Sequence, residues 1–172
     1  ISNFLEVAPY SDYQKGFNFY YVNEFKDLGC SYDEAIICDN KKVKNSAILC
    51  PHDYIVVLTE INGEKRLSSY LRSSAWLGAM HLNVEDNPLV FPHEFGHVFA
   101  DFADEYDYAG PINWDAPNCD SSVDACPRFQ VVEDSECYLG CSDLKHSRSV
   151  FNGLMRDYNL LDGQVYGNYN EY

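Results

Sequence analysis

The stretch Pro92-His93-Glu94-Phe95-Gly96-His97 decides how the rest of this chain can be interpreted. If it is helical, His93 and His97 lie one turn apart on the same face, so two imidazole nitrogens can reach a single ion while Glu94 lies beside them. Glu94 then has the place of a general base next to a metal-activated water. The spacing therefore predicts a zinc site with its own base, a more specific signal than two histidines on an ordinary buried helix.

The residues around this motif predict where the helix begins and which face it buries. Pro88 and Pro92 are start signals, because a proline in the first turn lacks only a donor that would be unpaired there anyway. We expect the helix to begin between residues 88 and 92 and to end near Ala103. At about 100° per residue, an apolar stripe forms nearly opposite the histidines and should pack inward, leaving them to face a cleft. The stripe consists of Phe95, Val98, Phe99 and Phe102.

A third metal ligand should follow the motif, because a catalytic zinc ion usually takes three protein ligands and leaves one position for water. The candidates are Asp104 and Glu105. On a straight helix Asp104 would lie about 10 Å from His97 along the axis, at about 1.5 Å per residue, which is too far to share an ion. The chain must therefore turn back after about Phe102.

Composition and charge describe one globular domain over residues 1–172 and exclude some partners. With 172 residues, 46% of them hydrophobic and 15% aromatic, the chain can bury a real core. A net charge of −15 with only 12 lysines and arginines argues against nucleic-acid binding, which needs a basic surface. The sequence has no run as long as a membrane span and no leader-like apolar start. Because it starts with Ile rather than Met, we expect a mature or excised fragment.

Apolar runs before the motif predict the strands of a mixed, twisted sheet. Residues 17–22 have aromatic and β-branched content. Residues 54–59 form a continuous apolar run suited to the buried middle of the sheet. Residues 77–83 are the last strand before the motif helix, either an internal strand or an edge that pairs with an extended peptide. Residues 107–149 are rich in Pro, Cys, Asp and Ser. We therefore expect an α+β fold, α/β-like in its upper half, with a central active-site helix and an irregular, disulfide-bearing C-terminal part.

Seven cysteines predict a disulfide framework rather than a thiolate metal site, because none belongs to a CxxC pair. They are Cys30, Cys38, Cys50, Cys119, Cys126, Cys137 and Cys141. This framework favours an extracellular or periplasmic location and a secreted protein. The odd number leaves one free thiol or an intermolecular bond. Short loops suggest pairing of Cys119 with Cys126 and of Cys137 with Cys141.

The motif and its continuation resemble the metzincin clan of zinc peptidases, in which the motif helix ends at an abrupt turn, a third ligand returns to the metal, and a methionine-containing turn lies below it. A closer resemblance is to the IgA-peptidase family, whose HEFGH pattern is followed after six further residues by Asp-Glu-Tyr. Those patterns are residues 93–97 and 104–106 of this chain. The likeness extends to residues 17–21, 53–58 and 153–156, so it covers most of the chain.

This resemblance implies roles for individual residues. It implies the zinc ligands His93, His97 and Asp104, the general base Glu94, and the methionine of the turn, Met155. One departure is that metzincins usually place a glycine in the turn after the second histidine, whereas residues 100–103 contain none. A residue other than glycine at positive φ costs about 1 kcal/mol or more. How the turn is built is therefore open, and Glu105 is the alternative third ligand.

The resemblance also implies that Tyr158 could serve as an oxyanion donor, since some metzincins use a tyrosine just after the methionine turn. With 14 tyrosines in the chain, packing is the competing interpretation. We expect a zinc-dependent endopeptidase that hydrolyses peptide or protein substrates through a zinc-activated water, with Glu94 as general base. The alternative is a non-catalytic, metal-dependent peptide- or protein-binding module. A further alternative is a zinc peptidase whose third ligand is a distant glutamate, Glu133 or Glu136.

Overall fold

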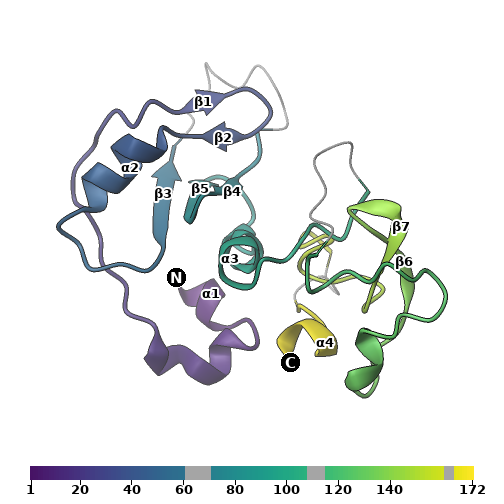
Figure 1. The fold of residues 1–172 in the computed structure, drawn as a ribbon. Coiled ribbons are helices and arrows are strands. Elements are labelled where there is room, and N and C mark those ends of the chain that lie inside the picture. Colours follow the sequence, from purple (N-terminus) through teal and green to yellow (C-terminus); the bar gives the residue numbers. More distant parts are fainter. Residues whose placement is uncertain (61–70, 108–114, 161–164) are drawn as a thin grey trace. The chain divides into compact units, whose positions relative to one another are not determined.

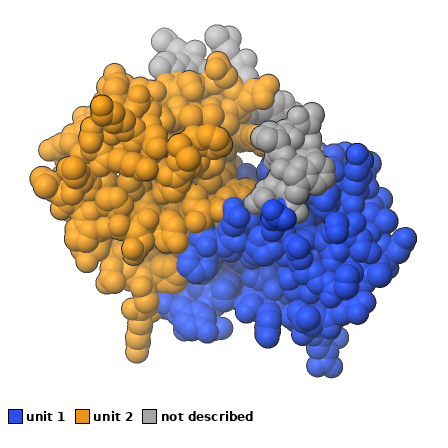
Figure 2. Space-filling model, in the orientation of Figure 1, with its two compact units in different colours: residues 1–14, 99–172 blue, residues 15–98 orange. Residues whose placement is uncertain are grey.

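The computed structural model describes residues 1–60, 71–107, 115–160 and 165–172. These residues form helices and small sheets, which confirms the α+β class (Figure 1). The chain divides into two compact units, which Figure 2 colours separately. Unit 1 comprises residues 1–14 and 99–172, and unit 2 comprises residues 15–98. None of the helices in the described ranges is both long enough and apolar enough to cross a membrane.

The main sheet of unit 2 has three strands in the order β3-β5-β4. β3 (Ile55–Thr59) is parallel to β5 (Ala79–Asn83), and β4 (Ser74–Trp76) is antiparallel to β5, so the sheet is mixed as predicted. β5 is the central strand, so it is an internal strand rather than a sheet edge that could pair with an extended peptide. β3 confirms the strand predicted over residues 54–59, but its predicted place in the buried middle of the sheet is wrong. It lies at an edge of the described sheet, and Val56 and Leu58 are exposed because only one face of the strand is covered.

The core of unit 2 lies between this sheet and the segment that precedes it. β1 (Ser31–Tyr32) and β2 (Ile36–Ile37) form an antiparallel pair, followed by helix α2 (Asn40–Ala47) (Figure 1). The helix begins where the side chain of Asp39 accepts a hydrogen bond from the backbone N–H of Lys42, 2.9 Å away. Its buried face joins one hydrophobic cluster with the sheet. That cluster consists of Ile36, Cys38, Val43, Val57 and Ala79.

The strand predicted over residues 17–22 is wrong, because the structure gives these residues no regular secondary structure. The aromatic rings pack individually instead. Phe17 meets Phe95 at a centroid distance of 6.2 Å and stacks on Phe19 at 6.3 Å, while Tyr20 and Tyr21 are exposed. β-propensity reflects how well a side chain fits a pleated, half-buried surface, so aromatic content alone does not make a strand.

Unit 1 contains a hairpin within the part predicted to be irregular. β6 (Tyr138–Cys141) and β7 (Asp143–Arg148) pair antiparallel, with an irregularity between Leu139 and Cys141. The buried guanidinium of Arg148 donates hydrogen bonds to the carbonyls of Leu139, Gly140 and Phe151, which tie the hairpin to the loop after it. Unit 1 also contains the short helices α1 (Ser2–Leu5), η3 (Phe129–Val131) and α4 (Asn168–Glu171). The 3-10 helix η1 (Tyr10–Gly16) begins in unit 1 and ends in unit 2.

Three disulfides confirm the predicted framework, but the predicted pairing is wrong. The bonds are Cys30–Cys38, Cys119–Cys141 and Cys126–Cys137. Cys50 is the free cysteine. Cys119 and Cys141 meet in a buried cluster with Ala103 and Ala116, so tertiary packing rather than short loop length selects the partners.

Candidate metal site

The motif lies on helix α3 (Val90–Ala100), as the spacing predicts. The side-chain oxygen of Asn87 accepts a hydrogen bond from the Leu89 N–H at 2.9 Å, and its carbonyl accepts one from the Val90 N–H at 2.8 Å. These bonds satisfy donors of the first turn, in which Pro92 needs none. The helix starts within the predicted range and ends at Ala100, earlier than the predicted Ala103.

The burial of α3 differs from the predicted stripe. Phe95 is buried and packs edge-on against Tyr54, with centroids 5.1 Å apart, so the first half of the stripe faces inward. Phe99 is 58% exposed, and Phe102 lies beyond the end of the helix. The predicted inward stripe is therefore wrong in its second half, because the helix stops before a continuous apolar face forms.

The two histidines and Asp104 form a group that could hold a metal ion. The rings of His93 and His97 have centroids 4.9 Å apart and planes at 88°. Each of the three side chains offers one ligand atom, and these atoms all lie within 4.8 Å of one another. Two imidazoles and a carboxylate are ligands that zinc accepts at about 2.0–2.2 Å, so the donor set fits this ion. Within the described ranges, this is the group of His, Cys, Asp or Glu side chains close enough together to hold a metal ion.

The turn after α3 is made by Asp101 rather than by a glycine. Asp101 has φ 56°, a left-handed conformation, immediately after the last helical residue, Ala100. This conformation is the usual way to end a helix, and glycine is the usual residue for it. Aspartate visits it more readily than most other residues because its short polar side chain can form local hydrogen bonds. The chain thus leaves the helix axis before Asp104.

Glu105 follows Asp104 but occupies a different environment. Its side chain is 1% exposed, and Oε1 accepts hydrogen bonds from Nδ2 of Asn118 at 3.2 Å and from Nδ2 of Asn170 at 2.8 Å. Its backbone N–H donates to the carbonyl of Met155 at 2.9 Å. The carboxylate that belongs to the metal-ligand group is that of Asp104. Glu105 instead anchors the same short segment inside unit 1.

The other candidate residues differ in burial. Glu94 is 6% exposed, next to His93 on α3, and Met155 is fully buried in unit 1. Tyr158 is half-buried in the segment after Met155. Glu133 and Glu136, the distant alternatives for the third ligand, are exposed and outside the metal-ligand group.

Asn118 and Ser142 are residues that the sequence interpretation missed. Both are buried and both donate hydrogen bonds to the segment that carries Asp104. No motif or spacing marks them, since each lies far along the chain from that segment. Asp101 had a weak signal, because an aspartate directly after a helix is one of the few residues that tolerate a left-handed turn.

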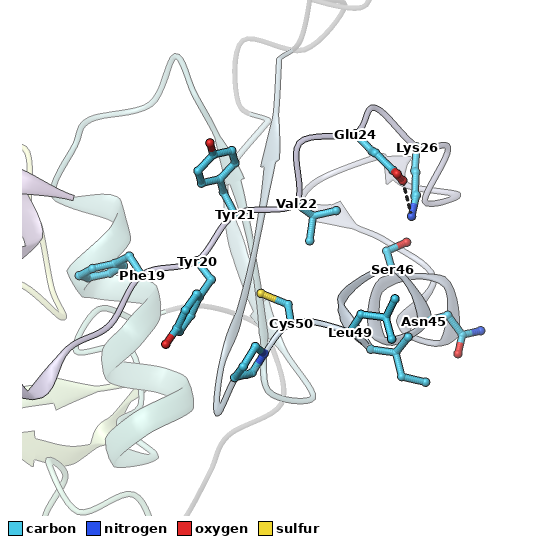
Figure 3. Close-up of a pocket in the computed structure, with 12 residues that line it drawn as sticks. Phe19, Tyr20, Tyr21, Val22, Glu24, Lys26, Asn45, Ser46, Leu49 and Cys50 are labelled. Atoms are coloured by element: carbon cyan, nitrogen blue, oxygen red, sulfur yellow. Dashed lines mark ion pairs between the residues drawn. The ribbon is translucent and has the colours of Figure 1, made fainter.

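A separate hollow in unit 2 has a volume of about 570 Å³ and lies between residues 19–26 and the end of α2 (Figure 3). Its lining is largely aromatic and aliphatic, and it includes the free thiol of Cys50. Glu24 and Lys26 form an ion pair of 2.7 Å within it. None of the motif residues lines this hollow, so it does not belong to the metal-ligand group.

No family model matches this sequence, and no curated protein matches it significantly. The assignment of a function therefore depends on the donor set and on the residues around it.

Proposed function

We propose that this chain is a zinc-dependent endopeptidase of the metzincin type, similar to the IgA-peptidase family. The observation that carries the proposal is the metal-ligand group of His93, His97 and Asp104, whose ligand atoms lie within 4.8 Å of one another. Three such ligands leave a fourth position for water, which is the arrangement of catalytic rather than structural zinc. The adjacent Glu94 completes the set that peptide hydrolysis requires.

The residues of the chain would divide the reaction among them. When bound, zinc supplies Lewis acidity and lowers the pKa of its water to about 7. Glu94 accepts the proton of the attacking water and delivers it to the leaving amine. Tyr158, three residues after Met155, would donate a hydrogen bond to the oxyanion. Met155 is the methionine of the turn in this assignment.

The place of Glu94 favours an enzyme over a binding module. Glu94 is only 6% exposed and lies next to the proposed ligand His93 on α3. A module that only retained the metal would need the three ligands and no carboxylate beside them. An enzyme needs that carboxylate as its base, which explains why it is there.

The proposed substrate is a peptide or protein in an oxidising compartment. Three disulfides are typical of extracellular or periplasmic proteins, so we propose a secreted enzyme. The net charge of −15 argues against a nucleic-acid substrate.

The decisive experiment compares Glu94→Gln with Glu136→Gln, a matched change at an exposed carboxylate. Glu94→Gln should keep one zinc per chain by elemental analysis, while cleavage of casein or a peptide library falls by at least about 100-fold, the scale of general-base catalysis. Glu136→Gln should keep both zinc and activity. A chelator should abolish cleavage by the unmodified protein. A fully active Glu94→Gln protein would overturn the assignment, and unmodified protein that binds zinc but cuts nothing would favour the binding module.

A further inference from the structure

We infer that Asn118 and Ser142 are positioning residues that hold Asp104 in place, and that the disulfide Cys119–Cys141 joins the two segments that carry them. This inference rests on the proposed function, because Asp104 is the proposed third ligand. It is carried by hydrogen bonds that all lie within unit 1. We call Ala103–Asp104–Glu105 the ligand arm.

Asn118 binds the backbone of the ligand arm on one side of Asp104. The Ala103 N–H donates to Oδ1 of Asn118 at 2.8 Å, and Nδ2 of Asn118 donates to the Ala103 carbonyl, also at 2.8 Å. The side-chain amide thus pairs with Ala103 as a neighbouring β-strand would. Nδ2 also donates to Glu105 Oε1 at 3.2 Å. Asn118 is 0% exposed, so water cannot replace these bonds without a rearrangement.

Ser142 binds the other side of the same residue. Its backbone N–H donates to the Asp104 carbonyl at 2.8 Å, and its hydroxyl donates to the same oxygen at 3.0 Å. The Glu105 N–H also donates to the carbonyl of Met155. The backbone on both sides of Asp104 is therefore held by three distant parts of unit 1. The ligand arm itself belongs to no helix or strand. These hydrogen bonds therefore fix the position of Asp104, as helix α3 fixes the positions of the two histidines.

Each positioning residue is the sequence neighbour of one cysteine of the disulfide. Asn118 directly precedes Cys119, and Ser142 directly follows Cys141. Both half-cystines are buried in the cluster that contains Ala103, the first residue of the ligand arm. The covalent bond therefore limits how far Asn118 and Ser142 can move apart. Since both must contact adjacent residues of the arm, this bond keeps the two halves of the contact in register.

Residues that orient metal ligands without touching the metal usually affect metal affinity strongly. Their loss typically costs about 10–100-fold in affinity or activity, because part of the binding free energy is then used to order the ligand side chain. Asn118→Ala removes three hydrogen bonds to the arm and should weaken zinc binding by about 10–100-fold. Ser142→Ala removes one hydroxyl bond, keeps the backbone bond, and should weaken it by about 2–10-fold.

The control is Tyr10→Phe, which removes a buried hydrogen bond of 2.7 Å to Tyr166 elsewhere in unit 1. Zinc affinity would be measured by competition with a chromophoric chelator, and the ligand field by the absorption spectrum of the cobalt-substituted protein. Stability of each metal-free variant would be measured by urea denaturation. Tyr10→Phe should lower stability but leave the affinity and the cobalt spectrum unchanged, whereas Asn118→Ala and Ser142→Ala should change both.

The outcomes separate this inference from the proposed function. Unmodified protein that binds no zinc would overturn the proposed function itself. If the unmodified protein binds zinc, a folded Asn118→Ala protein with the same affinity and the same cobalt spectrum would overturn the positioning role. Should Asn118→Ala fail to fold, Ser142→Ala decides the matter by the same two measurements.

Discussion

The histidines of α3 and the aspartate that follows them obtain their positions from different parts of the chain. His93 and His97 are four residues apart on one helix, so helical geometry alone places their rings 4.9 Å from each other. Asp104 lies on the ligand arm, which has no regular structure and is fixed by Asn118, Ser142 and the carbonyl of Met155. One half of the candidate site is therefore encoded locally, and the other half depends on contacts that close only when unit 1 folds.

The two halves of the candidate site should therefore respond differently to mutation. A helix of eleven residues keeps its two histidines on one face as long as it stays helical. The ligand arm loses its position whenever a distant partner moves, even if that partner never touches the metal. Changes at the distant partners of the ligand arm should therefore weaken metal binding without altering the histidine pair, and three comparisons between variants test how the two halves of the site respond.

The largest effect is expected at the ligand arm itself. Asp104→Asn removes the proposed carboxylate ligand and should lower zinc affinity by more than about 100-fold, beyond the range of residues that only orient a ligand. Glu105→Gln should keep zinc but lower the free energy of unfolding by about 1 kcal/mol, because the amide oxygen can still accept both hydrogen bonds but lacks the charge that strengthens them. Elemental analysis after dialysis and urea denaturation measure the two effects. The reverse pattern, with zinc lost only in Glu105→Gln, would make Glu105 the third ligand.

The next largest effect is expected at the disulfides, which allow two matched double variants to be compared. Replacing Cys119 and Cys141 with alanine opens a loop closed over 22 residues, and replacing Cys126 and Cys137 opens one closed over 11. Loop-closure entropy makes each worth about 3 kcal/mol. Both double variants should therefore unfold at lower urea concentration. Zinc affinity, measured by chelator competition, should fall only for the first pair, and equal affinities would show that the bond does not act on the arm.

The parts of this structure that could be predicted from the sequence are those that depend on local periodicity. The spacing of His93 and His97 predicts α3 and its histidine pair. The continuous apolar run at residues 54–59 predicts β3, and residues 77–83 predict β5. The strand expected over residues 17–22 is absent because its aromatic rings find partners singly rather than in a ladder.

The remaining features depend on partners that are far away in sequence. Cys119 bonds Cys141 rather than the nearer Cys126, because the hairpin formed by β6 and β7 returns the chain to the ligand arm. Asn118 pairs with Ala103 across 15 residues and Ser142 with Asp104 across 38. Neither asparagine nor serine carries a spacing signal, so only the folded structure identifies the contacts that hold Asp104.

The smallest effect is expected at Asp101, which joins the two halves of the site. Its φ of 56° costs an ordinary residue about 1–2 kcal/mol. Asp101→Val should therefore lower the free energy of unfolding by about 1–2 kcal/mol, because a branched side chain tolerates this conformation poorly. Asp101→Gly should change it by no more than about 1 kcal/mol, since relief of strain is offset by greater freedom of the unfolded chain. Urea denaturation gives both values. Val and Gly variants of equal stability would show that the turn is not left-handed at this residue, and that the arm leaves the helix by another route.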